Sequence, residues 1–471
     1  MRRRCPWRAV LECLEPALLL GGAGAFVAVF LVDYFGTPTT IHEEMINALL
    51  FFDRPASSVG GELAKVFNVY GTELGGVRNR PIEYVVQLIG AKLFFLVNSR
   101  LPFAILHDFV TPAVLLLTAL VLRFALGVLI PSAPAPFLWL LAGFFLVTGQ
   151  VLATPVVYSR PAKPLASLAI AFLLYVWGRY RERTRIDGAA WYVLTGALCV
   201  LVLTDEQTQL ALVFFLGVAV IELVAGRKGM PFVLSAAAAG AVALLSGLWL
   251  YPLLLVRFGP GLGDTAFSSP SSFLRADGEV AKLVVDAFTL NVGLEFGGLP
   301  DGGRLWSLLG LSALLAAVCL GGRDAFRRIP AWFEPFLVFF LLVMTYCLAL
   351  RHPPILWPDM VRVSYFLPCA LLTYVGLIML VDRFGAFGTK AGRICTLVAL
   401  LVFGAGNVMT TPQTKRVALA GILAPSEIAT AQARRILASP GNGDGETPEI
   451  EALRPDMRRF VRYFLSRTRD R

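Results

Sequence analysis

The chain has 471 residues, of which 57% are hydrophobic and only 16% are charged. Its mean hydropathy of +0.70 lies outside the range of soluble globular proteins, because one solvent-facing fold could not bury so much apolar side chain. The net charge of +10 could suggest a nucleic-acid partner, but the basic residues fall mainly between apolar segments and form no nucleic-acid-binding motif. The composition therefore indicates an integral membrane protein and argues against nucleic-acid binding.

Apolar segments long enough to cross a bilayer recur along the chain. A hydrocarbon core of about 30 Å needs roughly 20 apolar residues in a helix. On this criterion we predict an all-α integral membrane protein with about eleven transmembrane helices. Their approximate centres are Ala25, Leu117, Phe144, Ala171, Val200, Phe215, Ala241, Ala313, Phe340, Leu372 and Leu401.

The basic residues predict the orientation of these spans. With the N-terminus in the cytoplasm, the inner tail and loops hold seventeen Lys and Arg residues. The short outward linkers then hold only Arg160, Lys163, Arg351 and Arg362. The positive-inside rule favours this arrangement. An odd number of spans places the tail from about Thr411 outside, and the Gly- and Ala-rich composition suits a bacterial inner membrane with a periplasmic outer face.

Two outward connections are much longer than the inward ones. The first covers about residues 33–106 and contains two helical apolar patterns, 43–52 and 82–97, whose polar residues suit helices lying in the membrane interface. The second covers about residues 257–304 and is rich in Gly, Pro and Ser, which indicates irregular backbone. We therefore predict a transmembrane domain over residues 1–411, including both loops, and an outward tail over 412–471 with amphipathic helices.

Motifs for metal and nucleotide chemistry are absent. The sequence has three His and lacks Cys-x-x-Cys, His-Glu-x-x-His and phosphate-binding-loop patterns, which argues against structural zinc, a zincin and an ATP-driven pump. Charged residues are also scarce at the middle of the predicted spans, which weakens the case for an ion-coupled transporter. The polar chemistry is concentrated at the predicted outer surface.

The first outward loop begins with an acidic motif. Asp33 follows the first span, and His42, Glu43 and Glu44 open the first loop helix. Two adjacent carboxylates repel each other, and burial against lipid would raise a pKa further, as a general base requires. In the alternative interpretation both glutamates face water and simply favour a helix N-terminus.

Basic residues at the outer surface are candidates for binding a phosphate. Arg78 and Arg80 precede the second loop helix, where their guanidinium groups and the helix N-terminus could hold a phosphate together. The late outward segment RHPPILWPDMVRVSYF adds Arg351, His352, Arg362 and Tyr365. Anchoring of ordinary lipid headgroups would give the same pattern.

A tight acidic turn joins two predicted spans at the outer face. It contains Asp205 and Glu206, and a carboxylate pair at this depth is a candidate for binding hydroxyl groups of a polar substrate. A solvated turn is the alternative. The outward segment YSRPAKP adds Arg160 and Lys163, which could converge with the other cations on one anionic lipid.

In combination these features resemble the multi-pass membrane glycosyltransferases of the GT-C type, which use polyprenyl-phosphate sugars. The shared pattern is a first span and a long outward loop with an acidic motif, here HEE, followed by an Arg-Pro step that opens a juxtamembrane helix, here RNRPIEYVVQL. An acidic turn, here TDEQ, and a late aromatic motif, here VSYFLP, complete it. The resemblance covers most of residues 10–410 by architecture, and its motifs are short.

The resemblance implies an inverting transferase acting at the outer face. A carboxylate of the first outward loop would deprotonate a hydroxyl of a glycan, lipid or protein acceptor, and the hydroxyl would attack the anomeric carbon as polyprenyl phosphate leaves. Glu43 or Glu44 would be this base, with Asp33 in reserve, although many relatives carry an Asp at this place. No cofactor is expected; a divalent metal between carboxylates is an alternative, for which these residues lack a full set of oxygen ligands.

The resemblance also implies roles for the remaining polar residues. Cations that would neutralise the leaving phosphate are Arg78, Arg80, Arg351 and Arg362. Residues that would contact the sugar or the acceptor are Asp205, Glu206, His352 and Tyr365. Two other functions compete: a transporter or flippase of a lipid-linked saccharide, which would need polar residues lining a path across the spans, and a membrane scaffold whose loops and tail bind partners.

Overall fold

The computed structural model describes most of the N-terminal half and parts of the C-terminal half. The described residues are 6–36, 40–41, 43–69, 81–98, 107–153, 157–158, 162–180, 183, 185–205, 228–250, 367–383, 385–419 and 448–469, together with single positions between 208 and 224, at 253, between 309 and 316, and between 428 and 435. Most of this backbone is helical, and one pair of two-residue strands accompanies the helices.

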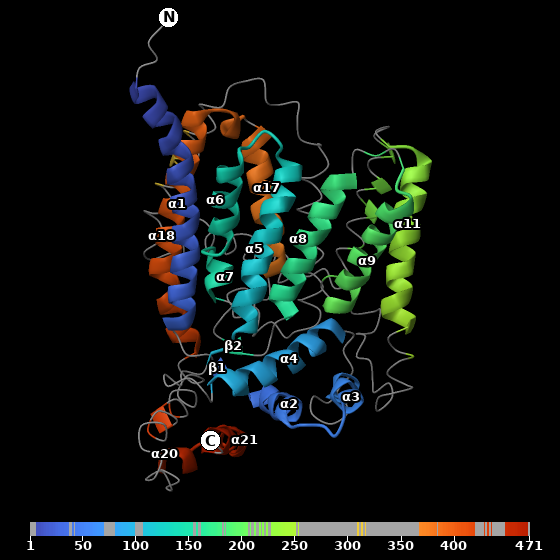
Figure 1. Cartoon of the computed structure of the whole chain (residues 1–471), viewed down its shortest axis with the longest axis vertical. Coiled ribbons are helices and arrows are strands. Elements are labelled where there is room, and N and C mark those ends of the chain that lie inside the picture. The colour runs from blue at the N-terminus through green and yellow to red at the C-terminus, as the bar shows by residue number, and fades with distance from the viewer. Residues whose placement is uncertain are drawn as a thin grey trace, which may run out of the picture.

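A bundle of helices forms the larger part of the described fold (Figure 1). Its members are α1 (Pro6–Gly36), α5 (Val110–Leu129), α6 (Ala135–Phe145), α7 (Gly149–Ala153), α8 (Ala162–Tyr180), α9 (Gly188–Thr204), α11 (Met230–Leu245), α17 (Leu367–Arg383) and α18 (Lys390–Leu419). Eight of the eleven predicted span centres lie in these helices. Of the others, Phe215 and Phe340 lie outside the described residues, and Ala313 is described only as an isolated helical position.

Four helices are long and apolar enough to cross a membrane. They are Leu14–Gly36 within α1, α4 (Pro81–Asn98), α5, and Lys390–Met409 within α18. Large apolar side chains on the bundle, such as Leu18, Leu117 and Phe124, are exposed, as side chains that face lipid must be. A helical, membrane-associated protein is therefore supported, and the full set of about eleven spans stays a prediction.

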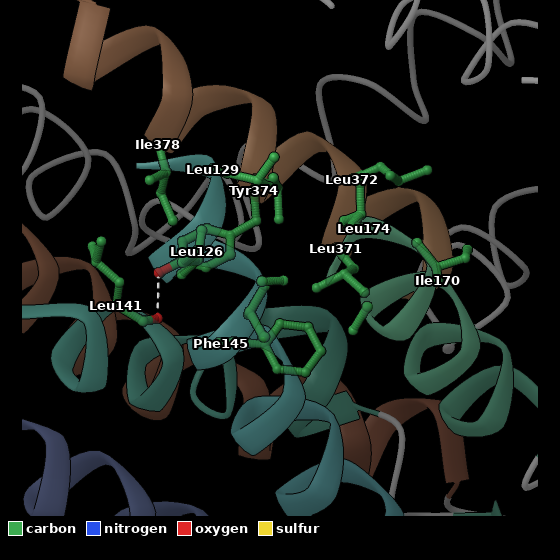
Figure 2. Packing of buried hydrophobic residues seen from close by; sticks show 14 of the residues in the cluster. Leu126, Leu129, Leu141, Phe145, Ile170, Leu174, Leu371, Leu372, Tyr374 and Ile378 are labelled. Carbon is green, nitrogen blue, oxygen red and sulfur yellow. Dashed lines mark hydrogen bonds between the residues drawn. The ribbon is translucent and has the colours of Figure 1, made fainter. Parts of the chain in front are cut away.

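The centre of the bundle is packed by aromatic and aliphatic side chains of α5, α6, α8 and α17 (Figure 2). Tyr374 is 1% exposed, and its hydroxyl donates a hydrogen bond to the carbonyl oxygen of Leu141 at 2.5 Å. Its ring also lies against Phe144, with the centroids 5.7 Å apart. Because a buried phenol needs a hydrogen-bond partner, this contact both satisfies the hydroxyl and holds α17 against α6.

Small residues allow α1 and α6 to approach closely. A Cβ atom added to Gly143 would lie 3.2 Å from the carbonyl oxygen and 3.3 Å from the Cα of Ala23. Backbone atoms cannot move aside as the end of a side chain can. Close contacts of this kind, between small residues, are typical of helix packing in membranes.

A second layer lies across one end of the bundle (Figure 1). It contains α2 (Glu43–Asp53), α3 (Val59–Val69) and α4. Both helices predicted in the first outward loop are confirmed as α2 and α4, whereas α3 was not predicted. Figure 1 shows α4 lying across the ends of bundle helices and not alongside them, although its length and composition also suit a span.

The C-terminal helices belong to this layer. They are α20 (Pro448–Glu451) and α21 (Pro455–Arg469), and α21 packs its apolar face against α2 and α4. Phe460 and Phe464 lie against Phe95, and the hydroxyl of Tyr463 donates to Asp53 at 2.7 Å. The apolar face of this amphipathic helix, which the sequence predicted within the tail, is therefore covered by the protein itself.

This packing places the two ends of the described chain on opposite faces of the bundle. α1 begins at one end of the bundle, and α21 lies beyond the other end (Figure 1). An odd number of crossings produces such an arrangement. The side of the membrane on which each end lies remains a prediction from the positive-inside rule.

We expect Gly143→Leu to destabilise the protein by about 1–3 kcal/mol, because the larger side chain must separate α1 from α6. Gly196→Leu in α9 is the matched control, since a Cβ at Gly196 meets nothing within 4 Å. Thermal unfolding of the purified protein in one detergent measures both. Equal melting temperatures for the two variants would contradict the close α1–α6 contact.

The docking of α21 gives a second prediction. Phe464 is fully buried, so Phe464→Ala should weaken the attachment of α21 by about 3–5 kcal/mol. Arg462, which is exposed on the same helix, provides the control variant Arg462→Ala. Limited proteolysis should cut Phe464→Ala before α21 much faster than the wild type and the control. Equal cutting rates would show that α21 is not held by this cluster.

Candidate functional site

We call the surface where α2, α3 and α4 cover the ends of bundle helices the loop face (Figure 1). α1 and α9 end at the loop face, and α5 and α8 begin there. The predicted site residues whose positions the structure describes follow these helix ends. Asp33 lies in the last turn of α1, Glu43 and Glu44 begin α2, and Asp205 follows α9.

A short pair of strands joins two of the predicted motifs at the loop face. β1 (Thr40–Ile41) pairs in parallel with β2 (Val157–Tyr158), with Thr40 opposite Val157 and Ile41 opposite Tyr158. β1 comes directly before the acidic motif at the start of α2. β2 comes directly before the basic segment that leads into α8. Two segments that are more than a hundred residues apart in the sequence are therefore held side by side.

A buried ion pair joins α8 to the end of α9. The ammonium of Lys163 donates to Oδ1 and Oδ2 of Asp205 at 3.1 and 3.0 Å. Lys163 is 6% exposed and Asp205 is fully buried. Thr208 shapes the turn after α9, because its hydroxyl donates to the backbone carbonyl of Asp205 at 2.5 Å. The predicted cation and the predicted acidic turn therefore form one site.

Helix dipoles do not explain why these charges lie here. Asp205 follows the C-terminal end of α9, which carries a partial negative charge, and Lys163 lies in the first turn of α8, which carries a partial positive charge. Each side-chain charge therefore lies at a helix end whose partial charge has the same sign, which is unfavourable. Burial adds a desolvation cost to both, which their mutual attraction has to offset. Such a pair contributes little to the stability of the fold, which favours a role in binding a ligand.

A junction of hydrogen bonds fixes α4 relative to α5. The side chain of Asn98, the last residue of α4, donates to the carbonyl oxygen of His107 at 2.9 Å and accepts from its backbone N–H at 2.9 Å. Tyr34 of α1 donates to the carbonyl oxygen of Asp108 at 2.7 Å. All four residues are buried. The C-terminal end of α4 is therefore tied to the ends of α1 and α5.

Asp108 also caps α5. Its carboxylate accepts from the backbone N–H of Val110 at 2.9 Å and from the hydroxyl of Thr111. Burial raises the pKa of Asp108, and the hydrogen bonds from Thr111 and Val110 oppose this rise. Burial also lowers the pKa of His107 to about 4, so this imidazole is neutral at pH 7. The spacing of Asp108 and Thr111 is a capping signal that the sequence analysis passed over.

The junction determines where the other end of α4 lies. α4 has 18 residues and is about 27 Å long at 1.5 Å per residue. α5 packs against α8, α8 packs against α9, and α4 contacts α9. Since neighbouring helix axes lie about 8–10 Å apart, α4 is long enough to run from α5 beneath α8 to α9. Its N-terminal half therefore lies on the side of α8 and α9.

The N-terminal half of α4 carries two buried polar side chains. Glu83 is 4% exposed and Gln87 is 7% exposed, and the amide of Gln87 donates to Glu83 at 2.9 Å. Both residues lie in the half of α4 that reaches toward α9, the helix that Asp205 follows. The sequence had marked these residues only as polar positions of an interfacial helix. Because this half of α4 lies beneath α8 and α9, Glu83 is an additional candidate site residue.

Salt bridges hold α3 against α4. A carboxylate oxygen of Glu62 lies 3.0 Å from the ammonium of Lys92 and 3.1 Å from that of Lys65. Burial would raise the pKa of Glu62, but the backbone N–H of Ala56 and the ammonium groups of Lys92 and Lys65 together lower it to about 2. Glu62 is therefore ionised throughout the physiological range. This interaction stiffens the layer that covers the site.

Several predicted site residues cannot be placed. The residues Arg78, Arg80, Glu206, Arg351, His352, Arg362 and Tyr365, and with them Arg160, lie outside the described part of the chain. For Glu43 and Glu44 only the backbone position at the start of α2 is described. Within the described residues, no three His, Cys, Asp or Glu side chains are grouped so that they could hold a metal ion. Dependence on a divalent metal stays an alternative prediction.

Comparison with known proteins adds no family assignment. No model of a known protein family matches the chain, and no curated protein matches it.

Proposed function

We propose that this chain is a GT-C-like glycosyltransferase of the inner membrane with about eleven spans, a cytoplasmic N-terminus and a periplasmic C-terminus. It would move a sugar from a polyprenyl-phosphate donor to an acceptor hydroxyl at the outer face, with inversion. The β1–β2 pairing carries the proposal, because it holds the acidic motif at the start of α2 beside the segment that leads to Lys163. An acidic group and a substrate-binding group on one surface are what such a transfer requires.

In the proposed reaction, a carboxylate of Glu43 or Glu44 removes the proton from the acceptor hydroxyl. The hydroxyl oxygen then forms a bond to the anomeric carbon of the donor sugar, and the bond from that carbon to the phosphate oxygen breaks. Polyprenyl phosphate leaves, and Arg78, Arg80, Arg351 and Arg362 are proposed to stabilise its charge. The polyprenyl chain stays in the bilayer, so the reacting groups meet at the interface, where α2 begins.

The Lys163–Asp205 pair is proposed to bind and orient the sugar or the acceptor. A buried carboxylate presents acceptor oxygens to sugar hydroxyl groups, and the ammonium of Lys163 fixes the orientation of the Asp205 carboxylate. Glu83 and Gln87, which are hydrogen-bonded to each other on α4, are proposed to extend this polar surface. Glu206, His352 and Tyr365 are proposed to contribute further contacts.

The base is tested with Glu43→Gln, Glu44→Gln and Asp33→Asn. Removal of a general base should lower the rate of sugar transfer by about 10²–10⁴-fold while donor binding persists. Transfer of labelled sugar from a panel of polyprenyl-phosphate donors by purified protein in lipid measures the rate. Glu451→Gln is the control, because Glu451 is exposed on α20 and belongs to none of these motifs.

The outcomes separate the competing functions. One carboxamide variant that binds donor but does not turn over would identify both the enzyme and its base. Unchanged rates in all three would refute the assignment of the base. Wild-type protein that turns over none of the donors, yet moves a lipid-linked saccharide between leaflets, would replace the proposal with a transporter.

The ion pair is tested with Asp205→Leu alone and together with Lys163→Met. The single change leaves a buried ammonium without its partner and should cost about 3–5 kcal/mol of stability, whereas the double change should restore most of that loss. If the pair binds substrate, the double variant is stable but needs a much higher substrate concentration for half-maximal rate. A stable double variant with wild-type kinetics would show that the pair is only structural.

A further inference from the structure

An apolar groove lies between α1, α5 and α6, away from the loop-face site. Its volume is about 320 Å³, at the lower end of the range for ligand pockets of about 300–1,000 Å³. The lining is aliphatic apart from Trp139, and small residues hollow it, among them Ala23, Gly24, Ala119 and Gly143. Such a lining suits a hydrocarbon chain and offers nothing to a sugar.

The groove opens on the surface of two candidate membrane spans. Gly24 lies near the middle of the span Leu14–Gly36, and α5 supplies the opposite wall. Leu20 is 48% exposed and Trp139 is 38% exposed, so the groove is open to its surroundings. A Cβ added to Gly24 would meet no atom within 4 Å. At this depth the surroundings are lipid chains.

A cation lies beside the groove at the end that points away from the loop face. Arg123 follows the groove residue Leu120 by one turn of α5, and its guanidinium lies 5.6 Å from the ring centroid of Trp139. Its Nε is buried and has no hydrogen-bond partner, and within the described residues it forms no ion pair. Arg123 also lies six residues before the end of α5, about 9 Å inside the span.

An arginine at this depth is costly and normally marks a functional contact. The stacking on Trp139 and on Phe124 stabilises the guanidinium but leaves its hydrogen-bond donors for another group. A guanidinium binds the oxygens of a carboxylate or a phosphate in two-point geometry, and the phosphate is the one that membrane phospholipids carry. The groove and the cation together therefore fit a molecule with a negatively charged phosphate and an apolar chain.

We propose that this groove binds one anionic phospholipid of the leaflet opposite the loop face. One acyl chain lies in the groove between α1 and α5, and the phosphate accepts hydrogen bonds from Arg123. Trp139 lies at the boundary between the two parts, as aromatic residues do at membrane interfaces. The proposal does not depend on the proposed transferase activity, because none of the groove residues, and not Arg123, is assigned to the transferase site.

The test is a lipid titration of the delipidated, full-length protein followed by native mass spectrometry. The lipids are phosphatidylglycerol, phosphatidylcholine and a polyprenyl phosphate, each added separately. We expect one phosphatidylglycerol per chain, bound at least about tenfold more tightly than phosphatidylcholine. The choline ammonium of phosphatidylcholine would compete with Arg123 for the phosphate, whereas phosphatidylglycerol has no such cation.

Two pairs of variants locate the bound lipid. Gly24→Leu fills the groove, and Gly21→Leu is its control, since a Cβ at Gly21 also meets nothing within 4 Å and Gly21 does not line the groove. Arg123→Gln removes the cation, and Arg179→Gln removes an exposed cation from the last turn of α8. Gly24→Leu and Arg123→Gln should each weaken phosphatidylglycerol binding about tenfold, whereas both controls should bind as the wild type does.

Several results would overturn the proposal. Equal affinity for phosphatidylcholine would show that the charge of the lipid does not matter. Unchanged phosphatidylglycerol binding by Gly24→Leu would show that the lipid binds outside this groove. A tighter, Gly24-dependent complex with the polyprenyl phosphate would assign the groove to that lipid instead. Loss of binding in the controls as well would show that the variants act through the fold.

Discussion

The arrangement of the loop face depends on the hydrogen bonds between Asn98 and His107. They join the last residue of α4 to the residues that precede α5, and Asp108 then caps α5 while Tyr34 ties the same point to α1. Three helices are thus fixed at one buried point. An apolar helix such as α4 could cross a membrane by its composition, but this junction directs it across the ends of the bundle. The hydrophobicity of α4 is compatible with either orientation, and these local hydrogen bonds fix one of them.

Once α4 is held in this way, the charges of the loop face are confined between it and the bundle. The Lys163–Asp205 pair gains nothing from the dipoles of α8 and α9, and its burial removes it from water. A chain selected only for stability would gain from replacing the pair with apolar residues. Its retention at the surface where β1 and β2 join two distant motifs is most simply explained by binding of a polar group.

The sequence predicted the fold class and the first-loop helices because apolar length and periodicity are local properties. It also placed Lys163 and Asp205 at the outer surface, but it could not pair them, since their contact depends on how α8 and α9 pack. For the same reason it predicted amphipathic helices in the tail but not what covers the apolar face of α21. The sequence pattern of this face is the same whether lipid or α2 and α4 cover it. The packing of Phe94 and Phe95 of α4 in the same cluster shows that the protein covers it.

The bilayer explains why the polar groups of the bundle divide between its two ends. The proposed general base and sugar-binding carboxylate would have to meet the headgroup of a lipid-linked donor, which fits their position at the loop face. Arg123 follows the same rule at the opposite end, where its stem stays among apolar atoms and its guanidinium lies beside Trp139. The apolar middle of the bundle then has a mechanical role. In the proposed arrangement it separates the loop face from the lipid site at Arg123, so that each site would contact lipid of its own leaflet.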